Sequence, residues 1–262
     1  MIKDLTVVII TYNEETRIRD CIDNVRDLAE HVIVVDDEST DKTRDIAEEL
    51  GAGVYVRKMD IEGRHRNWAY SQVKTKWILS IDADERLTDG LKKEIRERLR
   101  DSQYQAYDIP RRNMVGDYWL RWGGQYPSDQ TRLFVKGVLT FEEKHDVHPA
   151  SIINVERPCL DSDIIHYTYR DVADMFRKMN NQTTLEAVKW NRIRKEDPEK
   201  AAQKMNFLHA LWRSMDRFCR AYFRKKGYKD GFYGFVNAYV GSVYQMAAYL
   251  KYYHLIRTEN GG

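Results

Sequence analysis

The sequence predicts an α/β fold, with a mostly parallel sheet flanked by helices and a C-terminal helical extension. Apolar, β-branched runs at residues 5–11 and 31–35 are typical of strands buried on both faces of a parallel sheet, and a helical apolar period separates them. After about residue 170 the chain becomes aromatic, basic and helical in pattern. We therefore expect an α/β domain at 1–168 and a helical region at 169–262.

The first strand leads into a helix. The apolar period predicts this helix from about Thr16 to Ala29. Its apolar face carries Ile18, Cys21, Ile22, Val25 and Leu28. We expect Cys21 to pack in the core. The three cysteines of the chain are few, odd in number and far apart, which favours a reducing compartment and predicts no zinc site.

The second strand ends in Asp36 and Asp37, and a helix and a third strand at 54–56 follow. Ser39 or Thr40 can cap that helix. Strands and helices alternating at this spacing predict right-handed crossovers and a parallel sheet. In such sheets, ligands bind at the carboxyl ends of the strands.

A further apolar strand within residues 76–87 delivers Asp82 and Asp84 where it ends. Mg²⁺ and Mn²⁺ take oxygen ligands and keep positions for water and substrate phosphate, so this pair suits a nucleoside diphosphate bridged through a metal ion. A solvated acidic turn is the alternative for such a pair alone. Polar residues follow several strand ends, and one crevice can collect them: Thr11, Asn13, Asp36, Asp37, Asp82 and Asp84.

Four motifs follow one another in the first third of the chain. They are Thr-Tyr-Asn-Glu at 11–14, Val-Val-Asp-Asp-Glu-Ser-Thr-Asp at 34–41, Arg-Asn at 66–67 and Ile-Asp-Ala-Asp at 81–84. In order and spacing they resemble the GT-A fold glycosyltransferases of family 2. The stretch Trp-Gly-Gly-Gln-Tyr-Pro-Ser-Asp-Gln-Thr-Arg-Leu-Phe at 122–134 and the later Val147-His148 resemble the branch that includes the lipopolysaccharide core glucosyltransferases.

The resemblance implies a metal-dependent inverting glycosyltransferase. It would move a hexose from a nucleotide-sugar donor, with UDP as the expected nucleotide, to a saccharide or lipid-linked acceptor of the bacterial cell envelope. The nucleoside would be bound by Thr11, Tyr12, Asn13, Glu14 and one of Asp36 and Asp37, between which the sequence does not choose. Arg66 would neutralise phosphate with Asn67 beside it, Asp82 would meet the ribose or a water, and Asp84 would bind Mg²⁺ or Mn²⁺.

Inverting transfer also needs a carboxylate that takes the proton of the acceptor hydroxyl. The family draws it from an acidic motif downstream, and Asp129 is the best match, with a helix-capping role as its alternative. The rival carboxylates are Glu142, Glu143 and Asp146. Arg132 would hold the base or a phosphate.

The resemblance also implies a later histidine for the metal or diphosphate, and His148 is our expectation. Pro149 follows it where the branch carries a glutamate, which puts the acceptor-side role of that carboxylate in doubt. His145 and His166 are possible substitutes for His148.

The C-terminal part predicts helices. Tyr169 to Trp190 reads as a helix with Met175, Met179 and Leu185 spaced for burial, and Asp197-Pro198 interrupts the pattern. Within 205–250 a basic, aromatic segment precedes a run without charges that is too polar to be a clear membrane span. We expect peripheral membrane contact there, with packing on the catalytic domain or between protomers of a homo-oligomer as the alternative.

Composition and motifs exclude several classes. A net charge of +2 gives no general attraction to nucleic acid, and no signal peptide precedes Leu5, so we expect a protein on the cytoplasmic face of the inner membrane. Arg86 stands where a haloacid-dehalogenase-type phosphatase needs Thr or Val, and residues 11–15 lack the glycine-rich loop of a nucleotidyltransferase. A non-catalytic GT-A nucleotide-binding module remains the alternative function.

Overall fold

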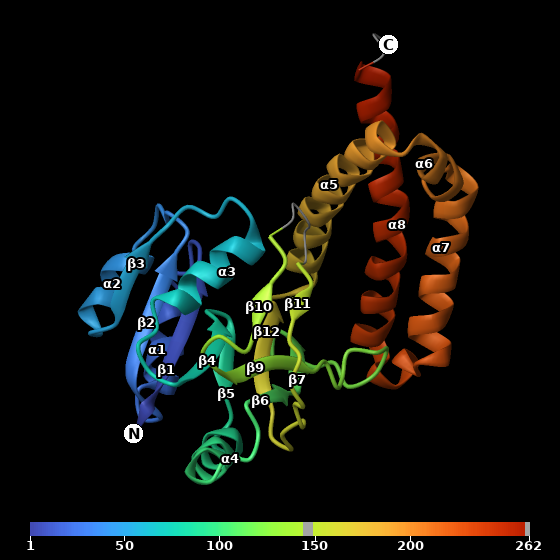
Figure 1. Cartoon of the computed structure of the whole chain (residues 1–262). Helices are drawn as coiled ribbons and strands as arrows, with labels where there is room; N and C mark the ends of the chain where they lie inside the picture. The colour runs from blue at the N-terminus through green and yellow to red at the C-terminus, as the bar shows by residue number, and fades with distance from the viewer. Residues whose placement is uncertain (144–148, 260–262) are drawn as a thin grey trace. The chain divides into compact units, whose positions relative to one another are not determined.

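The computed structural model describes residues 1–143 and 149–259 and divides into two compact units (Figure 1). The first unit contains Met1–Arg112 and Ser128–His166, and the second contains Asn113–Pro127 and Tyr167–Gly262.

A six-stranded sheet forms the centre of the first unit, in the order β3-β2-β1-β4-β9-β6. Its strands are β1 (Ile2–Thr11), β2 (Ala29–Asp36), β3 (Gly53–Val56), β4 (Trp77–Asp82), β6 (Ala106–Ile109) and β9 (Gln130–Val135). The first four are parallel to one another, and β9 runs antiparallel to its neighbours β4 and β6. The predicted α/β class with a mostly parallel sheet is confirmed.

Helices cover both faces of this sheet, which explains why its strands are apolar throughout. Side chains of α1 (Ile18–Val25), α2 (Thr43–Glu49) and α4 (Asp89–Arg100) share one buried cluster with one face of the strands, and α3 (Glu62–Ser71) packs on the other face. Cys21 is buried in the first cluster, as predicted. Helix α1 is shorter than expected because Ala29 already pairs with Ile2 in the sheet.

Short strands complete the first unit. The strand β5 (Glu85–Leu87) pairs with the start of β12 (Ile164–Tyr169), and β10 (Thr140–Phe141) pairs with β11 (Ser151–Ile152). In the first of these pairs Glu85 lies opposite His166, so a residue far along the chain returns to the end of β4.

The second unit combines helices with the end of β12 and the hairpin formed by the end of β7 (Arg111–Val115) and β8 (Tyr118–Trp119). Its helices are α5 (Val172–Glu196), α6 (Pro198–Lys204), α7 (Phe207–Cys219), the π-helical turn η1 (Arg220–Arg224), the 3₁₀ turn η2 (Gly227–Asp230) and α8 (Gly231–Glu259). Figure 1 shows α8 between α5 and α7, and it packs against both.

The helix pattern of the second unit is confirmed in outline. The break at Asp197-Pro198 is where α5 gives way to α6, and Met175 is buried. The predicted burial of Leu185 is wrong, because its side chain faces solvent and is 54% exposed. Tyr169 belongs to β12 and not to the helix. Helix α5 begins at Val172, and the Asp171 side chain caps its N-terminus. Of the helices formed by the described residues, none has the length and apolarity needed to cross a bilayer.

Candidate active site

A cavity of about 300 Å³ opens in the first unit at the carboxyl ends of β1, β2 and β4. The parallel register produces it, because Thr11 lies opposite Asp36 on one side of β1 and Ile10 lies opposite Asp82 on the other. The side chains around the cavity are those of Ile10, Thr11, Tyr12, Glu14, Asp37, Met59, His65, Asp82, Ala83, Asp84 and His166.

The structure separates the two neighbouring aspartates at the end of β2. Asp36 is fully buried, and its carboxylate accepts hydrogen bonds from the Ser39 amide at 2.8 Å and the Ser39 hydroxyl at 2.5 Å. Asp37 lines the cavity, and one of its oxygens accepts from the amide of Met59 at 2.6 Å. Asp36 therefore shapes the loop, and Asp37 is the carboxylate of the pair that lines the cavity.

Asn13 lies outside the cavity wall and joins two loops. Its backbone amide donates to the Ser39 hydroxyl at 2.8 Å, and its side-chain oxygen accepts from the backbone amide of Thr40 at 2.8 Å. Its φ of 52° is a left-handed conformation that Asn tolerates better than most residues. Ser39 and Thr40 therefore do not cap α2 as predicted. That helix begins at Thr43, after Lys42, without a side-chain cap.

Oγ1 of Thr11 and Nε2 of His65 are buried at the cavity and have no hydrogen-bond partner among the described residues. A buried donor or acceptor left unpaired costs about 1–3 kcal/mol, so atoms of this kind point to a ligand that completes them. Tyr12 lies at the same cavity with 56% of its surface exposed, so it is not a core residue and can offer its ring face.

Asp82 is held by arginines. Arg132 Nη2 donates to its Oδ2 at 2.6 Å, and Arg66 Nη2 lies 3.5 Å from its Oδ1. Burial alone would raise the pKa of Asp82, but Arg132 and Arg66 hold that pKa well below its usual range. Arg132 also donates to the fully buried Glu85 at 2.6 Å, which Arg111 approaches at 3.3 Å. Asp82 is therefore ionised, and the guanidinium groups of Arg132 and Arg66 balance its charge.

Asp84 meets a histidine. His166 Nε2 lies 3.6 Å from Asp84 Oδ2, and Arg17 Nη1 lies 3.8 Å from the same oxygen. Within residues 1–143 and 149–259 there is no group of three or more His, Cys, Asp and Glu side chains that could hold a metal ion. One carboxylate and one imidazole fit Mn²⁺ or Mg²⁺ only if water and substrate oxygens supply the remaining ligands.

Asp129 stands immediately before β9, on the side of the sheet edge where β4 ends. Its side chain is exposed, does not line the cavity and makes a hydrogen bond with Cys159. Burial, followed by the charge of Asp129, raises the pKa of the Cys159 thiol to about 11. Asp129 is therefore near the carboxyl edge of the sheet, with its carboxylate directed to a neighbouring segment.

Asn67 and Glu143, which the sequence also singled out, make contacts that join helix α3 to the segment around β10. Asn67 Nδ2 donates to the carbonyl of Phe141 at 3.0 Å, and its Oδ1 accepts from the amide of Phe141 at 2.9 Å, which fixes β10 on α3. Glu143 bonds Asn67 and Arg64. His148 lies outside the described residues.

Three participants were not identified from the sequence as parts of the site. His65 has a weak signal, because it lies next to the recognised Arg66 on the helix that faces the cavity. Glu85 has a stronger signal in the sequence, because it follows the acidic pair directly and lies two residues before the buried Leu87, on the same face of the strand. Arg17 has no signal in sequence spacing. His166, weighed as a substitute, is the histidine that reaches Asp84.

Comparison with known proteins finds relatives over most of the chain. The family model for glycosyl transferase family 2 matches residues 6–155. An uncharacterized glycosyltransferase of Rickettsia bellii is 32% identical over 251 residues, which span 91% of this chain and 82% of that protein. The lipopolysaccharide core biosynthesis glycosyltransferase LpsC of Rhizobium meliloti is 26% identical over 257 residues, spanning 95% and 92% of the two chains.

The fold is also that of a solved structure. The crystal structure of S. aureus TarS 1-349 in complex with UDP-GlcNAc superposes with a TM-score of 0.50 at 15% identity, covering 94% of this chain and 92% of that one. This likeness concerns the fold and confirms the expected GT-A architecture. The match of the family model over more than half of the sequence shows that the chain belongs to glycosyltransferase family 2.

Proposed function

We propose that the protein transfers a hexose, with inversion, from a UDP-linked donor to a saccharide or lipid-linked acceptor of the bacterial cell envelope. The observation that carries the proposal is the cavity at the ends of β1, β2 and β4, where Asp37 and the acidic pair Asp82 and Asp84 converge. The similarly folded TarS, whose structure contains UDP-GlcNAc, and the lipopolysaccharide core enzyme LpsC among the relatives support this choice.

The nucleoside would occupy the side of the cavity formed by Thr11, Tyr12 and Asp37. Asp37 has one oxygen engaged with the amide of Met59, and its other oxygen accepts no hydrogen bond from the described residues. A carboxylate is an acceptor-only group, so it selects a ligand that presents an N–H or O–H. The exposed ring of Tyr12 offers a stacking face beside it.

The diphosphate would lie toward Asp84 and His166. These two side chains would hold Mg²⁺ or Mn²⁺, which when bound acts as a Lewis acid that offsets the charge of the departing diphosphate. Asp82 is less suited to be a metal ligand, because Arg132 and Arg66 already neutralise it. We assign it instead to the ribose hydroxyls or to an ordered water.

The transfer itself is a substitution at the anomeric carbon. The acceptor oxygen forms a bond to that carbon while the bond from the carbon to the diphosphate oxygen breaks, and the electron pair leaves with the diphosphate. A carboxylate takes the hydroxyl proton. We keep Asp129 as the proposed base, since it stands at the carboxyl edge of the sheet. Arg132 would act through Asp82 as a positioning residue.

Calorimetric titration tests the donor assignment. We expect the purified protein to bind UDP and UDP-glucose with Mn²⁺ more tightly than with EDTA, because an ion held by Asp84 and His166 would offset the charge of the diphosphate. GDP is the comparison ligand. A protein that binds none of these nucleotides would refute the proposal, and binding without transfer to any envelope acceptor would favour the non-catalytic module.

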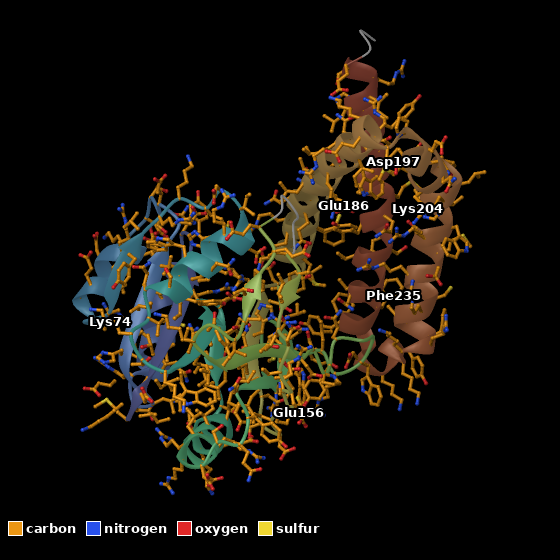
Figure 2. The ribbon with its side chains drawn as sticks, viewed as in Figure 1. Lys74, Glu156, Glu186, Asp197, Lys204 and Phe235 are labelled. Carbon is orange, nitrogen blue, oxygen red and sulfur yellow. The ribbon has the colours of Figure 1, made fainter. Side chains whose placement is uncertain are left out.

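For the acceptor side we propose that helices α7 and α8 contact an anionic membrane surface. One face of α7 exposes Phe207, Leu208, Leu211, Trp212 and Met215, with exposed fractions between 40% and 74%. Phe235, marked on α8 in Figure 2, extends this surface through ring contacts with Phe218 and Tyr222. Basic side chains of the same segment, including Arg213 and Arg220, suit anionic headgroups.

Vesicle sedimentation tests this surface. Replacing Leu208 and Trp212 together by serine removes two exposed apolar side chains, each worth about 1.5–3 kcal/mol on burial, so we expect at least about tenfold weaker partition into anionic vesicles. Leu185→Ser on α5 is the matched control, because that leucine is also exposed, at 54%, on another helix. Equal partition of both variants and the wild type would remove the membrane role.

A further inference from the structure

His65 presents an unpaired hydrogen-bond donor or acceptor to the cavity. The residue is fully buried on α3 and lines the cavity, yet its Nε2 has no partner among the described residues. The other ring nitrogen, Nδ1, lies 3.2 Å from Nη1 of Arg57. The ring is therefore fixed at one nitrogen, and the other nitrogen is buried beside the cavity without a partner.

The contact with Arg57 determines which nitrogen carries the proton. A guanidinium group only donates hydrogen bonds, so Nδ1 must accept, and in the neutral ring the proton then resides on Nε2. Burial, followed by the charge of Arg57, lowers the pKa of His65, which keeps the ring neutral at physiological pH. His65 thus offers one N–H donor to the cavity and no positive charge.

An acceptor faces the same space. Asp37 lines the cavity with His65, and its charge acts on the His65 ring. A neutral donor beside a carboxylate is a poor site for phosphate, because the carboxylate repels an anion. It matches a heterocycle that carries an N–H next to a carbonyl, as uracil does at N3. Cytosine has a lone pair at N3 and an amino group at C4, so it reverses both partners at that edge.

We propose that His65 and Asp37 together recognise the imide edge of uracil, with Asp37 accepting from N3–H and His65 Nε2–H donating to the carbonyl at C4. Arg57 is a positioning residue that fixes the tautomer of His65. The inference rests on the proposed nucleotide-sugar function and adds to it the basis of pyrimidine selectivity. It also gives the orphaned nitrogen of His65 a partner.

Competitive titration with UDP and CDP tests the proposal. The wild type should prefer UDP, and His65→Leu should weaken UDP binding about 10- to 100-fold while changing CDP binding little, so the UDP/CDP ratio falls. His65→Gln should keep most of the ratio, because the amide nitrogen of Gln lies near the position of Nε2. Thermal unfolding of each variant identifies any loss that comes from misfolding.

Two further measurements identify the atoms. Imidazole ¹⁵N shifts of the free wild-type protein should show a protonated Nε2 and an unprotonated Nδ1 for His65, a readout that a purely structural role does not require. The analogue 4-thio-UDP should bind more weakly than UDP to the wild type but not to His65→Leu, because sulfur is the weaker acceptor, and 2-thio-UDP is the comparison ligand.

The outcomes distinguish this inference from the proposed function. A UDP/CDP ratio unchanged in folded His65→Leu, or a proton on Nδ1 in the wild type, would overturn the reading of His65 while leaving the nucleotide site in place. A wild type that binds neither UDP nor CDP would overturn both. A ratio that falls in His65→Leu and is rescued in His65→Gln would support the proposal.

Discussion

Asp84→Asn is expected to abolish sugar transfer and to remove the dependence of donor binding on Mn²⁺. The substitution keeps the size of the side chain and removes the charge that His166 and Arg17 now face at 3.6 and 3.8 Å. Charge stabilisation by a bound metal ion is worth several kcal/mol, and about 4 kcal/mol corresponds to about a thousandfold in rate. Initial rates with UDP-glucose and donor titrations with Mn²⁺ and with EDTA measure the two effects.

Asp129→Asn is the matched comparison, since it makes the same chemical change at an exposed carboxylate outside the cavity. If Asp129 is the base, donor binding should stay intact while turnover is lost, because the base acts only on the acceptor hydroxyl. Full activity of both variants would contradict the assignment of the site. Loss of activity in Asp84→Asn alone would keep the donor site and move the base to another carboxylate.

Arg132→Met is expected to reduce both stability and activity. Arg132 is buried and bonds Asp82 and Glu85 at 2.6 Å each, so its removal leaves two carboxylates close together, one of them fully buried. Breaking a buried ion pair in this way costs about 3–5 kcal/mol. Chemical denaturation should therefore show a lower free energy of unfolding, and donor binding should weaken because Asp82 loses its position.

The pH dependence gives an independent check on Arg132. Arg132 and Arg66 hold the pKa of Asp82 below its unfolded value, so this stabilisation is present above the ordinary pKa of an aspartate and is lost as the pH falls through the lowered pKa. In the Arg132→Met variant, the free energy of unfolding should therefore fall less steeply as the pH is lowered through the acid range. Arg44→Met is the control, because Arg44 is 43% exposed and 3.8 Å from Asp36, and it should cost less than about 1 kcal/mol. Equal unfolding free energies for the two variants would contradict the argument.

The sequence predicts the parts of the fold that local chemistry determines. The strands ending at Thr11, Asp36 and Asp82 are apolar because both faces of the sheet are covered, and the parallel register then brings their ends together. The break at Pro198 likewise follows from local backbone chemistry. Apolar spacing alone failed at Leu185, because it does not show which face of a helix has a partner.

The site is predictable only in part, since a residue type does not show where its polar atoms point. Asp36 and Asp37 are adjacent and chemically identical, and only the hydrogen bonds from Ser39 show that Asp36 serves the loop. Similarly, the role of His65 depends on the donor that approaches its Nδ1. The partner of Asp84 comes from a strand pairing that joins residues 85 and 166, which no local pattern encodes.

The pairing of β5 with β12 brings together Asp84 and His166, the two residues proposed to hold the metal ion of the donor site. His166 lies beyond residues 6–155, the segment matched by the family model. The next residue, Tyr167, belongs to the second unit. A ligand bound by both Asp84 and His166 favours conformations in which these strands are paired, and by linkage it raises the free energy of opening that pair. The proposed donor site therefore predicts that donor binding and the pairing of β5 with β12 are thermodynamically coupled.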